Sequence, residues 1–396
     1  MLKALRSFAI TPRREIKEFF TTVTVQQLAV GAILIFEPIY LYQQGVSPTG
    51  IVLFNVAVYL PYFFLLPVGG KFAKRFGYEH TLFFATFFNI AYYLALAAIP
   101  LSRWFLFVAP LLLCLQKTFW WPAYHADFAR FSMSRQTGRE NGLAQTLYTI
   151  SSALGPFLGG VILLFTNFTV LFIVVVALSL ISVIPMFSTP ERFVPSKLGW
   201  LEQMKYLFSK HYRHRLIGSI GFGEEFLAFA LWPLFIYLIL KNAFDLGVIV
   251  ALATSVTVIV TLIIGRLADK GARVGRAAWR ARLVDGAALV QLLSWVLRPF
   301  GFGHNFGGML AADTAGRSAK NALLVPWYAV VYEDAKKNHV MLEVVAAEAA
   351  LVLGKLLAMG ALLVFFSVIP AMPIEQSLPI SFALGGVFSV FYFFFR

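Results

Sequence analysis

The sequence has few charged residues for its length. Asp, Glu, Lys and Arg together make up 13% of the 396 residues, whereas 59% are hydrophobic and 16% are aromatic. Soluble domains of ordinary composition carry roughly 25% charged residues. The composition therefore excludes a water-soluble globule and predicts a protein that is solvated by lipid.

Cysteine and enzyme motifs are also scarce. The chain has one cysteine, Cys114, so no internal disulfide can form and the sequence indicates no redox compartment. It has no phosphate-binding loop, nucleophile elbow or zinc motif. These absences predict a protein that is not an enzyme, has no ATPase of its own and uses no cofactor or metal.

Acidic residues are the scarcer of the two signs of charge. Nineteen Asp and Glu stand against 33 Lys and Arg, which gives a formal net charge of +14. Most of the basic residues fall in alternate connections between apolar runs, and Lys and Arg in short loops are retained on the cytoplasmic side. We therefore expect both termini in the cytoplasm, with only Arg103, Lys241 and Arg298 in outer loops. The positive charge then reflects this bias and attraction to anionic lipid headgroups, not nucleic-acid binding.

Long apolar runs dominate the chain. A transmembrane helix needs about 20 apolar residues, and twelve such runs can be placed, at 19–42, 48–69, 80–99, 104–123, 142–165, 168–188, 215–239, 245–265, 280–300, 303–329, 340–366 and 377–395. The sequence thus predicts an all-α integral membrane protein with twelve transmembrane helices. We divide it into an N-terminal six-helix half at 1–188 that begins with a short surface helix, a cytoplasmic linker at 189–214, and a C-terminal six-helix half at 215–396.

A short motif occurs twice, 195 residues apart. Gly70-Lys-Phe-Ala-Lys74-Arg75 and Gly265-Arg-Leu-Ala-Asp269-Lys270 each end the second apolar run of their half, and internal repeats are typical of secondary transporters. The first copy, with Gly77, resembles the loop motif of the major facilitator superfamily. The resemblance implies two pseudo-symmetric halves that alternate access to a central site.

The first copy departs from the family pattern. Lys74 stands where the family has an aspartate that docks near the start of the eleventh helix and holds the cytoplasmic gate shut. A reversed pair between Lys74 and Glu343 would serve the same purpose, and the repeat would set Asp269 against Arg139. The alternative is that these are independent, solvated loop charges, because exposed ion pairs contribute little.

The fifth run carries a second resemblance, to the fifth-helix motif of the drug/proton antiporter branch. Its matching residues are Gly142, Gly155, Pro156, Gly159 and Gly160, with Ser151 in place of one glycine. Small residues allow helices to approach closely and proline bends a helix, whereas export as a function is implied only by the resemblance.

Ionisable residues inside apolar runs are costly and usually functional. The candidates for a substrate- or proton-binding cavity are Glu37, Lys117, Glu224, Glu225, Asp313, Arg317, Lys320 and Lys355. All except Lys355 fall in runs one, four, seven and ten, which line the central cavity in this superfamily. Trp121 is among the aromatics that would stack on a substrate, and Asp313 and Arg317 are four residues apart, so they should pair.

Proton coupling requires a carboxyl group that gains and loses a proton. Glu224 and Glu225 are adjacent acids with no cation within a turn of their own helix, and burial together with mutual repulsion favours proton uptake. We therefore expect this pair to carry the proton, with Glu37 as the second candidate.

Together these features predict a monomeric secondary transporter in the inner (plasma) membrane, surrounded by lipid and exporting a small amphipathic solute in exchange for protons. One alternative is uptake of a sugar or organic anion, by symport or uniport, which is favoured if Lys117, Arg317 and Lys320 converge on one point. A transporter-shaped receptor or scaffold is a further alternative, but it would gain by losing its buried charges.

Overall fold

The computed structural model describes residues 14–132, 138–187, 199–210, 212–271, 276–299, 303–337, 340–370 and 372–394, and every regular element in these ranges is helical. The six predicted runs of the first half coincide with α2 (Arg14–Ile33) and its continuation α3 (Glu37–Gln43), α4 (Pro48–Phe76), α5 (Tyr78–Ala97), α6 (Phe105–Ser132), α7 (Gly138–Phe165), and α8 (Phe168–Val183) with the 3₁₀ turn η1 (Ile184–Phe187).

The second half begins with an irregular rod. It consists of α10 (Arg213–Ser219), a 3₁₀ turn η2 (Ile220–Gly223), α11 (Glu224–Phe226), a π-helical turn η3 (Leu227–Leu231) and α12 (Trp232–Leu240). It continues with α13 (Ala243–Gly271), α14 (Arg276–Leu297), α15 (Phe306–Lys337), α16 (Val340–Val368), α17 (Ile374–Ser389) and η4 (Val390–Phe394). The linker contains α9 (Trp200–Leu207). Single π-helical turns often mark functional sites, and this one follows the two adjacent glutamates directly.

The helices are those of a multi-pass membrane protein. Over the described residues, nine helical segments are long and apolar enough to cross a bilayer, and many of their large apolar side chains are exposed, such as Phe87 at 64% and Ile173 at 62%. Such surfaces fit lipid and not water. Helices α7, α14 and α15 are not among the nine, so a full set of twelve crossings stays a prediction.

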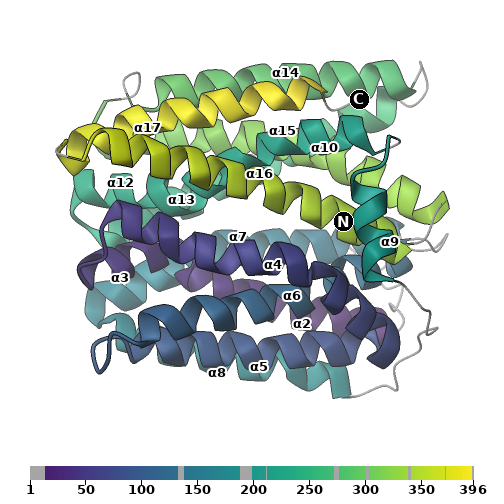
Figure 1. The fold of residues 1–396 in the computed structure, drawn as a ribbon, viewed down its shortest axis with the longest axis horizontal. Helices are drawn as coiled ribbons and strands as arrows, with labels where there is room; N and C mark the ends of the chain where they lie inside the picture. The colour runs from purple at the N-terminus through teal and green to yellow at the C-terminus, as the bar shows by residue number, and fades with distance from the viewer. Residues whose placement is uncertain are drawn as a thin grey trace, which may run out of the picture.

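The bundle repeats its packing (Figure 1). We call the helices from α2 to α8 the first set and those from α10 to α17 the second set. In the first set α6 packs on α4 and α5, and in the second set α15 packs on α13 and α14 in the same way. Likewise α2 packs on α7 as η2 packs on α16. The two sets meet where α7 contacts α13 and where α4 contacts α16. We call the end of the bundle that carries α9 the linker end, and the end where α3 and α12 finish the opposite end.

Glycines of the predicted fifth-helix motif lie where α7 touches its neighbours. A Cβ on Gly159 would lie 1.9 Å from the carbonyl oxygen of Ala32, and one on Gly155 would lie 2.7 Å from Gly31 of α2. Gly160 faces Gly247 of α13, where a Cβ would stand 3.3 Å from the α-carbon. These residues therefore let one helix contact both sets closely. Pro156 lies inside α7, whereas the surroundings of Gly142 lie outside the described residues.

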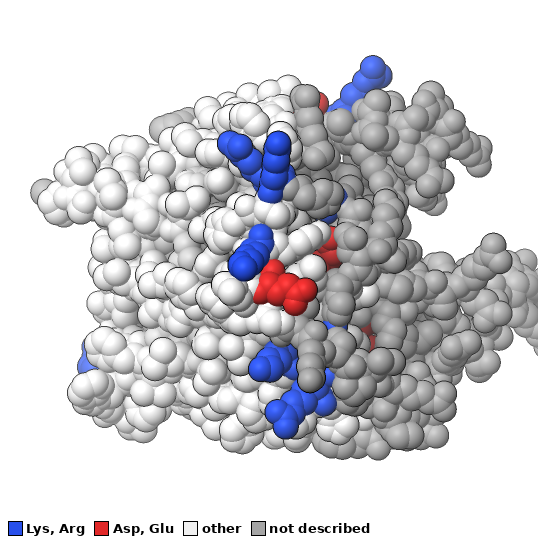
Figure 2. Space-filling view, turned by 45° about the vertical axis from the view of Figure 1, so that its right-hand side comes forward, with Lys and Arg blue, Asp and Glu red and all other residues white. Residues whose placement is uncertain are grey.

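Figure 2 shows basic side chains gathered toward the linker end, beside a broad surface without charge. Lys71 and Arg75 near the end of α4 and Lys205 and Lys210 in the linker are exposed there. Gly77, which separates α4 from α5, has φ of +104°, a conformation that a side chain would strain.

Candidate functional site

Glu37 begins α3, immediately after the break that separates it from α2. Pro38 follows and lacks an N–H, which is tolerated in a first turn. The hydroxyl groups of Tyr92 and Tyr93 on α5 donate hydrogen bonds of 3.0 and 3.1 Å to the two carboxylate oxygens. Both phenols are buried, so Glu37 is held by neutral donors.

Glu37 lines a cavity with about 300 Å³ of empty space between the two sets of helices. Its walls are mostly apolar and come from both sets, since Phe54 and Leu113 belong to the first and Phe229 to the second. Asn55 is a polar residue of the same wall. Mostly apolar walls with a few polar groups are typical of small-ligand sites.

Tyr59 lies one helical turn beyond Asn55 on α4, and two lysines approach its ring. The Nζ atoms of Lys117 on α6 and Lys355 on α16 lie 5.3 and 5.5 Å from the ring centroid. Phe229 packs against the same ring at 6.4 Å. Lys355 is the one candidate outside the four helices expected to line the cavity. It nevertheless approaches the same tyrosine ring as Lys117.

Glu225 lies between two lysines from different helices. Its carboxylate oxygens are 2.8 Å from Nζ of Lys355 and 3.0 Å from Nζ of Lys320 on α15. Lys320 also lies 2.8 Å from Glu224. Other helices therefore supply the cations that the helix of the two adjacent acids lacks, and the prediction that this pair carries the proton did not include these cations.

Glu224 faces the interior of the second set. One carboxylate oxygen accepts hydrogen bonds from Gln291 Nε2 at 2.9 Å and Trp295 Nε1 at 2.8 Å, and the other accepts one from Tyr392 at 3.1 Å. With Lys320 this side chain is fully satisfied, so it connects α11 to α14, α15 and η4 and does not line the cavity beside Glu37.

The predicted Asp313–Arg317 pair forms, with 2.6 Å between the carboxylate and Nε. Trp232 Nε1 donates a hydrogen bond of 3.0 Å to the other carboxylate oxygen of Asp313. Arg317 is thus paired with Asp313.

Arg298 is one of the three basic residues expected in outer loops. It lies in the turn that follows α14, but it is not exposed there: 3% of it is accessible, and its guanidinium lies 4.1 Å from the ring centroid of Trp295 and 4.9 Å from that of Trp232. A Cβ on Gly316 would overlap its Nη2 at 1.4 Å. The guanidinium is therefore enclosed by aromatic rings and backbone.

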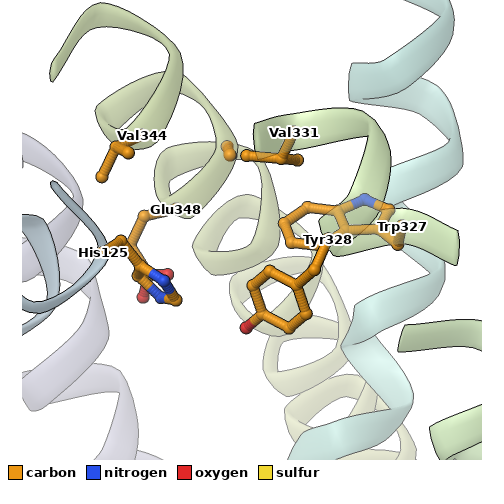
Figure 3. Close-up of a pocket in the computed structure, with 7 residues that line it drawn as sticks. His125, Trp327, Tyr328, Val331, Val344 and Glu348 are labelled. Atoms are coloured by element: carbon orange, nitrogen blue, oxygen red, sulfur yellow. The ribbon is translucent and has the colours of Figure 1, made fainter. Parts of the chain in front are cut away.

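Side chains from α6, α15 and α16 line a second, smaller cavity, with about 200 Å³ of empty space (Figure 3). His125 of α6 stacks on Tyr328 of α15 across it, with ring centroids 5.5 Å apart. Glu348 of α16 accepts a hydrogen bond of 3.0 Å from Tyr62 of α4. The ring of Trp121 stacks on that of His125, with centroids 5.5 Å apart. Trp121 therefore belongs to the group of aromatic rings at this second cavity.

The predicted gate residues have different partners from those expected. Among the described residues Glu343 binds Arg215, at 3.6 Å, and the hydroxyl of Tyr206 in α9, rather than Lys74. Gly70 packs closely on α16, where a Cβ would lie 2.9 Å from Val345. The surroundings of Gly265, Asp269, Lys270 and Arg139 lie outside the described residues.

Both ends of the cavity are bridged by contacts between the two sets. At the opposite end Gln43 Nε2 of α3 donates a hydrogen bond of 2.9 Å to the Tyr237 hydroxyl of α12. Toward the linker end the stacked rings of His125 and Tyr328 join α6 to α15. In the described part of the chain no three His, Cys, Asp or Glu side chains could hold a metal ion.

Several site residues were missed from sequence. Tyr59, Tyr62, Tyr92 and Tyr93 all point at charged groups, and tyrosines in apolar runs would otherwise be assigned to interfacial belts. Three of them lie one helical turn after an asparagine, Tyr59 after Asn55 and Tyr92 and Tyr93 after Asn89, which is the signal that could have identified them.

A family model described as Major Facilitator Superfamily matches residues 19–316. Among solved structures the chain is similar to the human organic anion transporter MFSD10 (TETRAN), with a TM-score of 0.65, 15% identity and coverage of 98% of this chain and 100% of that one. It is also similar to a mutant of the nucleoside transporter NupG, with a TM-score of 0.70, 13% identity and coverage of 95% and 97%. A third similar structure is the transporter FucP in the outward conformation, with a TM-score of 0.59, 15% identity and coverage of 98% of this chain and 99% of that one. No curated protein matches the chain.

Proposed function

The chain belongs to the major facilitator superfamily and is a transporter rather than an enzyme, and from this premise we propose that it moves a small amphipathic solute by alternating access, coupled to protons through Glu37. One observation carries the assignment of Glu37. It lines the cavity between the two sets of helices, and its carboxylate contacts are neutral phenols. Burial favours the neutral, protonated form of a carboxyl group, and within the described residues Glu37 forms no ion pair that would oppose it.

The other acids among the predicted cavity residues support this choice by contrast. Glu224, Glu225 and Asp313 are all paired with lysine or arginine at 3.0 Å or less. A carboxylate held between cations stays ionised through a transport cycle, so these groups are better suited to hold helices together. Two six-helix halves that rock about the cavity would expose Glu37 to each side in turn.

We propose export as the direction, on the resemblance of the fifth-helix motif to that of drug/proton antiporters. Uptake with protons is the second candidate, and Lys117 favours it. That ammonium borders the cavity, and within the described residues it makes no ion pair or hydrogen bond, so it is available to an organic anion.

The direct test is proton movement driven by solute. Drugs, sugars, amino acids and organic anions are first screened for thermal stabilisation of the purified protein, since a bound ligand raises apparent stability. Each binder is then added to vesicles that contain the protein and a pH-sensitive dye. Protons should move against the solute for export and with it for uptake, whereas solute flux without proton movement would show that coupling is absent.

Our proposal for the membrane is twelve crossings in an inner (plasma) membrane, with both termini in the cytoplasm, as a monomer surrounded by lipid. The basic linker end supports this orientation. Single cysteines at Ser47 and Lys241, in a Cys114→Ala background, should react with an impermeant thiol reagent on intact cells, and one at Lys210 should react only after lysis. Reaction of Lys210→Cys on intact cells would reverse the orientation.

A further inference from the structure

Lys117 stands apart from the other interior cations because of what surrounds it. Lys320 and Lys355 are neutralised by Glu224 and Glu225, and Arg317 by Asp313. Across the described residues, Lys117 has no carboxylate within ion-pair distance and no hydrogen bond; its ammonium lies over the ring of Tyr59, and Glu37 and Glu348 act on it only from a longer distance.

Arg298 also lacks partners, for its Nε and Nη1 atoms, in the described part of the chain. It is not open to a solute, however, because two tryptophan rings and the backbone at Gly316 enclose it and neither described cavity includes it. Lys117 is only partly buried. The two cations thus differ in access.

The helix faces connect Lys117 to the cavity that holds Glu37. Leu113 lines that cavity and lies one turn before Lys117 on α6, and Asn55 lines it one turn before Tyr59 on α4. Residues four apart share a helix face. Phe229 lines the cavity and also packs on Tyr59, so the Tyr59 ring and the Lys117 ammonium form one border of it.

An ammonium at the edge of an apolar cavity attracts one kind of group. Removing the ammonium of Lys117 from water without a partner is costly. An anion bound beside it would offset that cost. The rings of Tyr59 and Phe229 and the side chain of Leu113 suit a flat or branched apolar body next to it. The space in this cavity is small, so the solute must be a small molecule and the two sets of helices must move apart to admit it.

We propose that the solute is a small amphipathic monocarboxylate, whose carboxylate binds the ammonium of Lys117 while its apolar body lies against Tyr59 and Phe229. The proposal rests on the proposed function, in which this cavity carries the solute and Glu37 the proton. A single negative charge is expected because Lys117 is the one cation bordering the cavity, among the described residues, that no carboxylate neutralises.

The test compares ligands of one skeleton that differ only in charge. Phenylacetate, phenylacetamide and 2-phenylethylamine, with the corresponding sets built on benzoate and 4-methylpentanoate, are titrated into the purified full-length protein. Binding is measured by calorimetry and by thermal stabilisation. Carboxylates should bind more tightly than their amides, and amines should bind least.

Lys117→Met should weaken carboxylate binding by roughly ten- to hundredfold, the usual value of a charged hydrogen bond, and should leave amide binding unchanged. Lys117→Arg, which keeps the charge, should retain part of the affinity. Lys241→Met serves as the matched control, because Lys241 is exposed beyond α12. Unfolding midpoints without ligand show whether each variant is folded.

Equal binding by Lys117→Met and the wild-type protein would overturn the proposal, as would amides that match their carboxylates. Failure of every carboxylate to bind the folded wild-type protein would also overturn it. Because binding is measured without a proton gradient, the outcome is independent of coupling. Carboxylate transport without proton movement would refute the role of Glu37 and leave the Lys117 site standing.

Discussion

Replacing Glu37 with glutamine is expected to abolish solute accumulation driven by a proton gradient while sparing solute exchange across the same membrane. Glutamine keeps an oxygen that can accept hydrogen bonds from Tyr92 and Tyr93, which now donate to the carboxylate at 3.0 and 3.1 Å. It cannot take up a proton. The cavity therefore stays formed, but the step that links proton to solute is lost.

The size of the expected fall in accumulation follows from the loss of coupling between proton and solute. An uncoupled carrier can only equilibrate its solute across the membrane, so the ratio of inside to outside solute concentration should fall to unity. Glu375→Gln makes the same chemical change at an exposed position in the first turn of α17, and it should behave as wild type.

Accumulation and counterflow are measured in the same batch of vesicles, with the binders found by the stability screen. If Glu37→Gln still concentrates solute with an unchanged dependence on the proton gradient, the proton is carried elsewhere or the transporter is a uniporter. If counterflow is also lost, Glu37 holds the solute or the closed cavity, and its role in coupling is refuted.

The second large effect is expected from Lys320→Met, on stability. The Lys320 side chain is 13% exposed, lies 2.8 Å from Glu224 and 3.0 Å from Glu225, and donates to Tyr392. Without it, Glu224 is left as a buried carboxylate with no cation partner among its described contacts. Breaking a buried ion pair by removing one partner costs about 3–5 kcal/mol.

Adding Glu224→Gln to Lys320→Met should recover much of that loss, because glutamine removes the uncompensated charge and can still accept a hydrogen bond from Gln291 or Trp295. Lys71→Met, at an exposed position in α4, is the matched control and should change stability by less than about 0.5 kcal/mol. Thermal unfolding of the purified variants in one detergent provides the comparison. A double variant no more stable than the single one would show that Lys320 does not stabilise the bundle through Glu224.

Local features of the chain were readable from the sequence because each depends on neighbours within one helix. Apolar runs of about 20 residues identify membrane helices whatever they pack on, and the helices lie at the predicted segments. The Asp313–Arg317 pair forms because a spacing of four places both side chains on one face, as measured at 2.6 Å. The repeated loop motif placed the chain in its family, which the match over residues 19–316 establishes.

The partners of the buried charges were decided only by tertiary structure. Glu225 takes its cations from α15 and α16, Glu37 its donors from α5, and Arg298 its rings from α12 and α14. Spacing along one helix says nothing about which residue of another helix arrives at the same depth, yet charge interactions are strongest across such short gaps in a medium of low dielectric constant. The sequence by itself therefore determined the membrane helices, the family and the candidate charges, and the packing of helices decided which of those charges are neutralised and which, at Glu37 and Lys117, are left to face the cavity.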